Sequence, residues 1–195
     1  MKGKKLVVGI TGASGAPYAR VLLEALCEAR ARGEVELGVV LSRTASEVWR
    51  LEVGGELGEW LRARELPVFA GRDYAAPFAS GSAGWGAMVI APCSMSTCAK
   101  IAHGLSDDLL TRAADVMLKE RRALVLVPRE TPLSTIHLEN LLALARAGAI
   151  VLPAMPSFYG EARSVDALVG TVVARALDHL GIEHRLAKRW GEGDS

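Results

Sequence analysis

The sequence predicts a single α/β domain of the doubly wound, Rossmann-like class, built on a parallel sheet. Apolar runs alternate with amphipathic segments along the whole chain, which is the order of strands joined by crossover helices. The apolar runs are continuous, as in strands that helices cover on both faces. A length of 195 residues fits one domain, and 50% hydrophobic residues with only 5% aromatics indicate an aliphatic core.

Five short apolar runs predict the strands of this sheet. They cover residues 6–10, 35–41, 87–91, 123–127 and 149–152. Each of the last three is followed directly by a proline, which lacks the N–H that a strand interior needs and therefore marks the end of the run. We expect these five strands to form the buried centre of the domain.

Apolar residues at helical spacing predict the intervening helices. The expected helices cover residues 16–31, 42–53, 94–102, 106–121, 133–147 and 165–180, with a short turn at 57–61. Ser42, Ser94 and Ser106 are the expected N-caps of three of them. Glycines 54, 55, 148 and 181 follow three of the segments and would end those helices.

Composition excludes several classes of protein. The 23 Lys and Arg residues balance 22 Asp and Glu residues, so a nucleic-acid-binding surface is not expected. No apolar run approaches the roughly 20 residues of a membrane-spanning helix. Three cysteines without a CxxC pair disfavour zinc ribbons and disulfide frameworks. We expect a reduced, cytoplasmic protein with its domain at residues 1–182 and a tail at 183–195.

Mean hydropathy is high for such a chain, at +0.23. Either apolar surface is buried between subunits, or the sheet is covered on both faces.

The first strand is followed by a glycine-rich turn, GITGASG at residues 9–15. In doubly wound sheets, ligands bind outside the carboxyl ends of the strands, and the N-terminus of a helix there favours an anion or an electron-rich ring. The turn is neither a dinucleotide fingerprint nor a P-loop. It is either an ordinary tight turn or a ligand contact, for which Ser14 supplies the hydrogen-bonding side chain.

A second cluster of hydroxyls follows the third strand, in the sequence SMST at residues 94–97. Capping the next helix requires one hydroxyl, and three are present, which favours a bound phosphate. Together with the glycine-rich turn, this cluster indicates a mononucleotide, and FMN fits better than a dinucleotide.

Arg129 and Glu130 follow the fourth strand and lie between two prolines. A carboxylate beside a cation at the carboxyl end of a strand is well placed for acid/base chemistry, although a structural ion pair is the alternative. Tyr159, after the fifth strand, can donate to a phosphate or pack against the sheet edge.

Arg112 and Lys119 lie seven residues apart on one helix, together with Asp108 and Asp115. They form either a solvated stripe of charge pairs or a pair of cations aimed at a phosphate, possibly across a subunit boundary. Arg175, on the last helix, is a third candidate cation or a surface arginine.

The long loop at residues 71–85 carries Tyr74, Phe78 and Trp85. Loops of this length are often functional, so these aromatics either face a substrate or are scattered over the surface. The four histidines show no metal-ligand spacing, and Cys93 is interpreted as structural. No metal site is expected.

Taken together, these motifs resemble the UbiX-type flavin prenyltransferases, a family formerly named aromatic-acid decarboxylases. The resemblance covers nearly the whole chain, with separate motifs in the same order. They are GITGASG at 9–15, ASGS at 79–82, APCSM at 91–95, LTRAADV at 110–116, LKER at 118–121, PRETP at 128–132, HLEN at 137–140, FY at 158–159 and RW at 189–190.

The resemblance implies a flavodoxin-like fold and a defined reaction. The family joins the dimethylallyl group of dimethylallyl monophosphate to N5 and C6 of reduced FMN, without a metal. The product, prenylated FMN, serves a UbiD-type decarboxylase. The subunits assemble as trimers and dodecamers with active sites at subunit junctions, which agrees with the high mean hydropathy.

The resemblance also implies roles for individual residues. Ser14 and Glu130 match the catalytic positions, Ser14 near flavin N5 and Glu130 as the acid on the departing phosphate and later as a base. FMN-contacting positions are Gly12, Ala13, Ser14, Ser42, Ser94, Met95, Ser96, Thr97 and Arg129. Positions around the dimethylallyl phosphate are Tyr159, Arg175, Lys119, Arg112 and Gly81. Trp190 is placed over a neighbouring site.

The sequence departs from the family pattern at Ala19, Cys98 and Tyr74, where Gly, Leu and, in some members, Trp are common. Three alternatives stay open at this point. One is a flavin-dependent cysteine decarboxylase of similar fold, although that type needs an early histidine and His103 is the first here. The others are a non-catalytic FMN carrier and a direct decarboxylase of aromatic acids.

Overall fold

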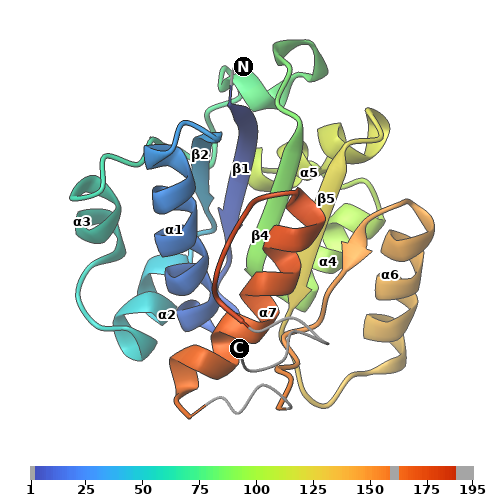
Figure 1. Cartoon of the computed structure of the whole chain (residues 1–195). Helices are drawn as coiled ribbons and strands as arrows, with labels where there is room; N and C mark the ends of the chain where they lie inside the picture. The colour runs from blue at the N-terminus through green and yellow to red at the C-terminus, as the bar shows by residue number, and fades with distance from the viewer. Residues whose placement is uncertain (1–2, 159–162, 188–195) are drawn as a thin grey trace.

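The computed structural model describes residues 3–158 and 163–187, which form one sheet with helices on both faces (Figure 1). The sheet has six strands, all parallel, in the order β3-β2-β1-β4-β5-β6. The strands are β1 (Lys4–Ile10), β2 (Val35–Leu41), β3 (Val68–Phe69), β4 (Ala87–Cys93), β5 (Ala123–Pro128) and β6 (Ile150–Val151). The strand order reverses between β1 and β4, and in this class of sheet the ligand crevice lies there.

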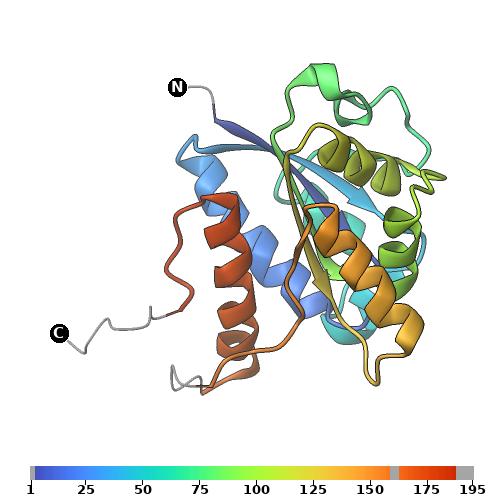
Figure 2. The ribbon, with the colours of Figure 1, turned by 90° about the vertical axis from the view of Figure 1, so that its right-hand side faces the viewer.

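The helices divide between the two faces of the sheet (Figure 2). On one face lie α1 (Ala16–Ala31), α2 (Ala45–Glu52), α3 (Leu57–Arg62) and α7 (Val165–Leu180). On the other face lie α4 (Met95–Ala102), α5 (Leu109–Lys119) and α6 (Thr135–Arg146). The sequence-based prediction of a doubly wound α/β domain is therefore confirmed.

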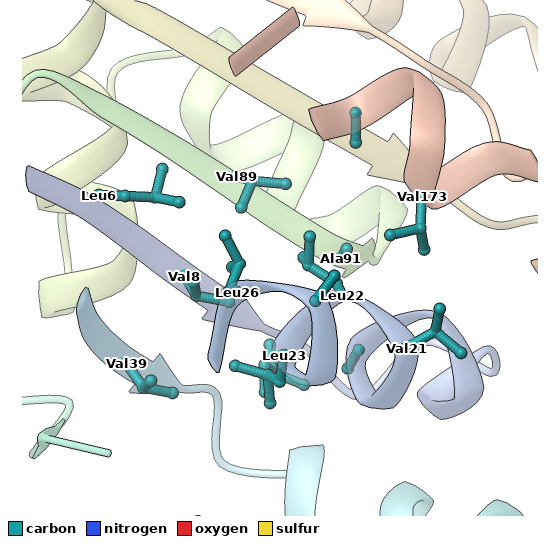
Figure 3. Close-up of a cluster of buried hydrophobic side chains, with 14 of the residues drawn as sticks. Leu6, Val8, Val21, Leu22, Leu23, Leu26, Val39, Val89, Ala91 and Val173 are labelled. Carbon is teal, nitrogen blue, oxygen red and sulfur yellow. The ribbon is translucent and has the colours of Figure 1, made fainter. Parts of the chain in front are cut away.

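Two aliphatic cores fill the space between the sheet and its helices. Alternate residues of each strand point to opposite faces, so Leu6 and Val8 join the core under α1 and α7, while Val7 joins the other core. Figure 3 shows the first of these cores, in which Leu22 and Leu26 of α1 lie against the sheet. Burial on both faces explains why the strands read as continuous apolar runs.

All five predicted strands are present, and the structure adds two features. β4 continues two residues past its expected end, through the cis Ala91–Pro92 bond to Cys93. A sixth strand, β3, pairs with β2 at only Val39 and Val40. A strand of two residues is too short to show a hydrophobic pattern, so the sequence analysis missed β3.

Two of the three predicted N-caps are wrong. Ser94 caps α4 as expected, by accepting a hydrogen bond from the Thr97 N–H. The N-cap position of α2, however, is Thr44 rather than Ser42. Likewise Asp108 rather than Ser106 caps α5, because its carboxylate accepts from the Thr111 N–H in a capping box.

The loop at residues 71–85 is more ordered than predicted and contains two short 3-10 helices, η1 (Pro77–Ala79) and η2 (Gly81–Ala83). Phe78 and Trp85 are buried and pack edge to face against each other. Neither ring faces a substrate in this chain, so that hypothesis is wrong for both. Tyr74 is half exposed.

The C-terminal segment that the structure describes, residues 183–187, packs against α7. His184 contacts Asp178 of α7 at 3.1 Å, and Leu186 lies on the core under that helix. Among the described helices, none combines the length and the apolar character that crossing a membrane requires.

Candidate active site

The buried hydroxyl of Thr11 ties together two loops at the carboxyl edge of the sheet, the lower edge in Figure 1. Its Oγ1 donates to the carbonyl of Pro92 at 2.8 Å and accepts from the N–H of Ser94 at 2.9 Å. The glycine-rich turn after β1 and the hydroxyl cluster after β4 are thus held side by side. This is the strand-order reversal at which a ligand is expected.

The start of α4 has the character of a phosphate-binding site. The Ser94 hydroxyl lies 3.0 Å from that of Ser96 and 2.9 Å from that of Thr97. Ser96 is exposed, whereas Met95 and Thr97 are buried, so one hydroxyl and the first N–H groups of the helix point outward. The positive end of the helix dipole adds to the attraction for an anion.

The N-terminus of α1 is already occupied by an anion of the protein itself. One carboxylate oxygen of Glu52 accepts hydrogen bonds from the N–H groups of Gly15 and Ala16, both at 2.7 Å. The sequence analysis left open whether this turn is an ordinary tight turn or a ligand contact, and it did not identify Glu52. In the sequence, Glu52 is only a carboxylate at the end of a helix. Its hydrogen bonds to Gly15 and Ala16 form because α2 packs beside α1, which the sequence does not reveal.

Glu52 is ionised in a network that includes two predicted site residues. Partial burial of the carboxyl opposes ionisation. Hydrogen bonds from the Ser14 hydroxyl and from the Gly15 and Ala16 N–H groups, with the charge of Arg129, outweigh it and lower the pKa of Glu52 below its ordinary value. The structure therefore brings Ser14, Glu52 and Arg129 together at one edge of the sheet.

Tyr18 borders the same group of residues. Its hydroxyl lies 3.4 Å from the carbonyl of Ala154, in the loop after β6. Burial raises the pKa of Tyr18, and the Arg129 guanidinium partly offsets that rise. Arg129 thus acts electrostatically on residues of two helices, Tyr18 of α1 and Glu52 of α2.

The loop after β5 presents Arg129 and Glu130 to solvent at the same edge. The Arg129 N–H bonds to the Cys93 carbonyl at 3.3 Å, so the loop is anchored to the end of β4. Glu130 accepts from the N–H of Thr131 at 2.9 Å, and within residues 3–158 and 163–187 its carboxylate forms no ion pair. An exposed carboxyl group here is free to turn toward a ligand.

Two further observations fit a flavin mononucleotide at this edge. The Ser42 Oγ is buried but has no hydrogen-bond partner among the described residues, as expected of a group that a ligand satisfies. At Gly12 a Cβ would lie 1.9 Å from Thr44 Oγ1, so the turn passes as close to the start of α2 as a glycine allows. Gly12 has no side chain and that of Ala13 is buried, so at these two positions the turn would contact a ligand through its backbone.

Two predicted substrate-binding residues, Gly81 before β4 and Lys119 before β5, lie at the opposite, amino edge of the sheet. The Gly81 carbonyl accepts from Arg122, which also bonds to Trp85 just before β4. Lys119 ends α5 and pairs with Glu120 at 2.6 Å.

Arg112 pairs with Asp115 at 3.0 Å and bonds to the Ala79 carbonyl. One chain therefore places Gly81 and Lys119 away from the edge that carries Ser14 and Glu130, and Arg112, in the first turn of α5, is held by Ala79 and Asp115.

Arg175 and Tyr159 complete the predicted set. Arg175 lies on α7 with its side chain 62% exposed and paired with Asp178 at 2.8 Å. Its guanidinium is available to a ligand if that pair opens. Tyr159 lies outside the described residues.

The cysteine chemistry agrees with a structural role. Hydrogen bonding with Cys98, 3.5 Å away, and burial both raise the pKa of Cys93, so this thiol is not activated. Within the part of the chain that the structure describes, no group of His, Cys, Asp and Glu side chains could hold a metal ion.

Comparisons with known proteins show the family to which the chain belongs. A family model described as Flavoprotein matches residues 1–177. The chain is 46% identical to a flavin prenyltransferase UbiX of Alkalihalophilus pseudofirmus, covering 97% of both chains.

Two solved structures are similar over nearly the whole chain. A dodecameric FMN-dependent UbiX-like decarboxylase from Escherichia coli O157:H7 has 48% identity and a TM-score of 0.89, covering 95% of this chain and 98% of that one. AnUbiX (PadA1), in complex with FMN and dimethylallyl pyrophosphate, has 41% identity and a TM-score of 0.90, covering 98% and 100%.

Proposed function

The chain belongs to the flavin prenyltransferases of the Flavoprotein family, and from this premise we propose how its residues divide the work of the reaction. The protein is a transferase that prenylates reduced FMN with the dimethylallyl group of a dimethylallyl phosphate. We take dimethylallyl monophosphate as the donor and N5 and C6 of the flavin as the positions that are joined.

The observation that carries this assignment is the carboxyl edge. There Thr11 holds the glycine-rich turn beside the hydroxyl cluster of α4, and the Arg129 N–H anchors the loop of Glu130 to the end of β4. Ser94, Ser96 and Thr97, with the first N–H groups of α4 after Met95, would hold the FMN phosphate. Gly12, Ala13 and the unsatisfied Ser42 hydroxyl would line the rest of the flavin site. The flavin, when bound, supplies the electron-rich ring that accepts the prenyl group.

Ser14 and Glu52 form the second part of the proposed machinery. Ser14 is exposed and its hydroxyl donates to the ionised Glu52 carboxylate, so the pair can pass a proton between a ligand and the protein. Arg129 stabilises the charge of Glu52 and, being exposed, can contact a ligand as well. Glu52 is thus added to Ser14 as a proposed functional residue.

Glu130 is proposed as the general acid and base. A monophosphate is a weak leaving group, and without a metal its growing charge has to be met by cations and by a proton. Glu130 is exposed on a loop anchored to β4, so it can deliver that proton to a phosphate oxygen when the allylic C–O bond breaks. Once the new bond to C6 has formed, the Glu130 carboxylate can accept the proton that C6 has to lose for the ring to become aromatic again.

Cations of the donor site are proposed to come partly from a neighbouring copy. The protein assembles as a homo-oligomer, and we expect the dodecamer of its relative. Because Lys119 and Gly81 lie at the amino edge of their own chain, and Arg112 is held by Ala79 and Asp115, we propose that these three residues border the carboxyl edge of another copy. Arg175 and Tyr159 are proposed to bind the same phosphate.

Two wider assignments complete the proposal. Prenylated FMN is a cofactor product, so we propose a UbiD-type decarboxylase as its recipient. We also propose a cytoplasmic location, because Cys27, Cys93 and Cys98 are all free thiols.

An anaerobic assay tests the function directly. Purified protein is mixed with reduced FMN and dimethylallyl monophosphate, and the released flavin is analysed by mass spectrometry. We expect a gain of one C5H8 unit together with release of inorganic phosphate. Unmodified FMN that stays bound, with no phosphate released, would instead favour an FMN carrier or a decarboxylase.

A further inference from the structure

The exposed face of α6 has the character of a contact surface. Asn140 of this helix is buried, with 5% of its surface exposed, and lies 3.1 Å from His103 at the end of α4. Leu138 and Leu142, in contrast, are 53% and 50% exposed. An amphipathic surface helix normally shows the reverse pattern, with polar residues outward. In Figure 2, α6 is the orange helix on the side that faces the viewer.

Three exposed apolar residues of α6 lie close together on one side of the helix, while Ile136, which is also exposed, lies on another side. Leu138, Leu142 and Ala145 are spaced i, i+4 and i+7, which places them on one stripe of the helix. The half-buried Leu141 lies between this stripe and the buried side of the helix. The stripe therefore continues the apolar surface that packs on the core and offers a seam for a second helix.

Two unpaired charges border the stripe. Glu139 and Arg146 are both exposed, and neither forms an ion pair with the described residues. They are seven residues apart, which is two turns or about 10 Å along one side of the helix. In an antiparallel pair of α6 helices centred near Leu142, Glu139 of each copy would face Arg146 of the partner subunit.

We propose that α6 is a two-fold contact between copies of this chain, in which two α6 helices pack antiparallel through their leucine stripes and two Glu139–Arg146 pairs. A two-fold interface uses the same patch on both copies, so the patch has to be self-complementary. The stripe and its charges meet that condition. The dodecameric relative shows that chains of this fold and similarity assemble, and α6 supplies an apolar surface suited to that contact.

Charge reversal tests the pairing without disturbing the single chain, because both residues are exposed. In Glu139→Arg, like charges face each other twice across the interface, and the same holds for Arg146→Glu. We expect the association constant between subunits to fall at least about tenfold in each variant. Mass photometry and light scattering should then show a smaller particle. Glu59→Arg, an exposed reversal on α3, is the matched control and should leave the particle mass unchanged.

Mixing provides the decisive measurement. A Glu139→Arg chain and an Arg146→Glu chain are complementary at an antiparallel contact, so an equimolar mixture should regain the parental particle mass. Far-UV circular dichroism confirms that each variant is folded before mixing. Unchanged mass in both single variants would overturn the proposal. Loss of mass in both with no recovery on mixing would overturn the antiparallel pairing.

Discussion

Thr11 illustrates how a single buried hydroxyl organises the site. It uses its proton to bond to Pro92, near the end of β4, and a lone pair to accept from Ser94, the N-cap of α4. The start of α4, the proposed phosphate site, is thereby fixed relative to the turn that carries Ser14. The remaining chemistry at this scale depends on two carboxyl groups, Glu130 and Glu52.

Replacement of Glu130 by glutamine is expected to stop turnover while FMN still binds. The amide keeps the size of the side chain but removes the proton that the leaving phosphate requires, a loss of about 10²- to 10⁴-fold in rate. Flavin binding measured by fluorescence should be unchanged, because the proposed phosphate site lies at α4. Normal turnover in this variant would remove Glu130 from the mechanism.

Replacement of Glu52 by glutamine is expected to change how stability depends on pH. The folded-state pKa of Glu52 is lowered below 4.5, so its ionised form stabilises the fold above about pH 4.5. That contribution is lost as the pH falls through the lowered pKa.

At neutral pH the Glu52→Gln variant should be destabilised by about 1 kcal/mol after allowance for solvent screening. Urea unfolding at several pH values measures the difference, which should shrink in acid. A difference that stays constant from neutral to acid pH would contradict the assigned ionisation.

Among the elements, α4 and α6 are linked by one polar contact in an otherwise apolar interface. Asn140 of α6 is buried and contacts His103, the residue after α4. α4 begins at the proposed phosphate site, and α6 follows the loop that carries Glu130. The contact therefore joins the C-terminal end of α4 to the middle of α6. Both helices follow loops of the candidate active site.

Asn140→Ala is expected to lower the free energy of unfolding by about 1–3 kcal/mol, since it removes a buried hydrogen bond and leaves a gap. Chemical denaturation gives this value. Thr135→Ala, an exposed change on the same helix, should stay within about 0.5 kcal/mol of the parent. Equal effects of the two substitutions would show that the buried amide has no special role.

Elements with a clear hydrophobic period were predictable from the sequence. α7 runs from Val165 to Leu180, the range expected from its period and from Gly181, which ends it with a left-handed backbone. The two wrong N-caps occur where several candidates are adjacent. Thr44 follows Ser42 closely, and Asp108 follows Ser106, so composition alone does not choose between them.

Residues of the candidate site were predictable where they directly follow a strand in the sequence. They were not predictable where their position depends on how helices and loops pack. Ser14, Ser94 and Arg129 follow strands directly, so the topology brings them to one edge. Glu52 reaches that edge only because α2 packs beside α1, and Phe78 is buried because its loop folds back onto β2. Neither arrangement leaves a pattern in the sequence.

For the molecule as a whole, the separation of the proposed substrate residues is the main consequence of the fold. α5 runs back from the carboxyl edge to the amino edge, so Lys119 lies at the far end from Glu130. The proposed function therefore requires contributions from two copies, and this requirement is testable with mixtures.

Lys119→Ala and Glu130→Gln are each expected to be inactive alone and active together. In a mixed assembly, some sites combine Glu130 from one variant with Lys119 from the other. Subunits are exchanged under mild denaturant, and prenylated FMN is then measured by mass spectrometry. Failure to recover any activity in verified mixed particles would place Lys119 outside the neighbouring site.

The two outermost strands, β3 and β6, are each only two residues long. The ends of the sheet therefore offer few unpaired backbone groups to an extended chain, and such edges are poor templates for aggregation. The apolar surface that remains exposed on α6 lies on a helix whose own backbone is already hydrogen-bonded. The exposed apolar surface of this fold thus favours helix-to-helix assemblies of finite size over fibrils built by adding strands.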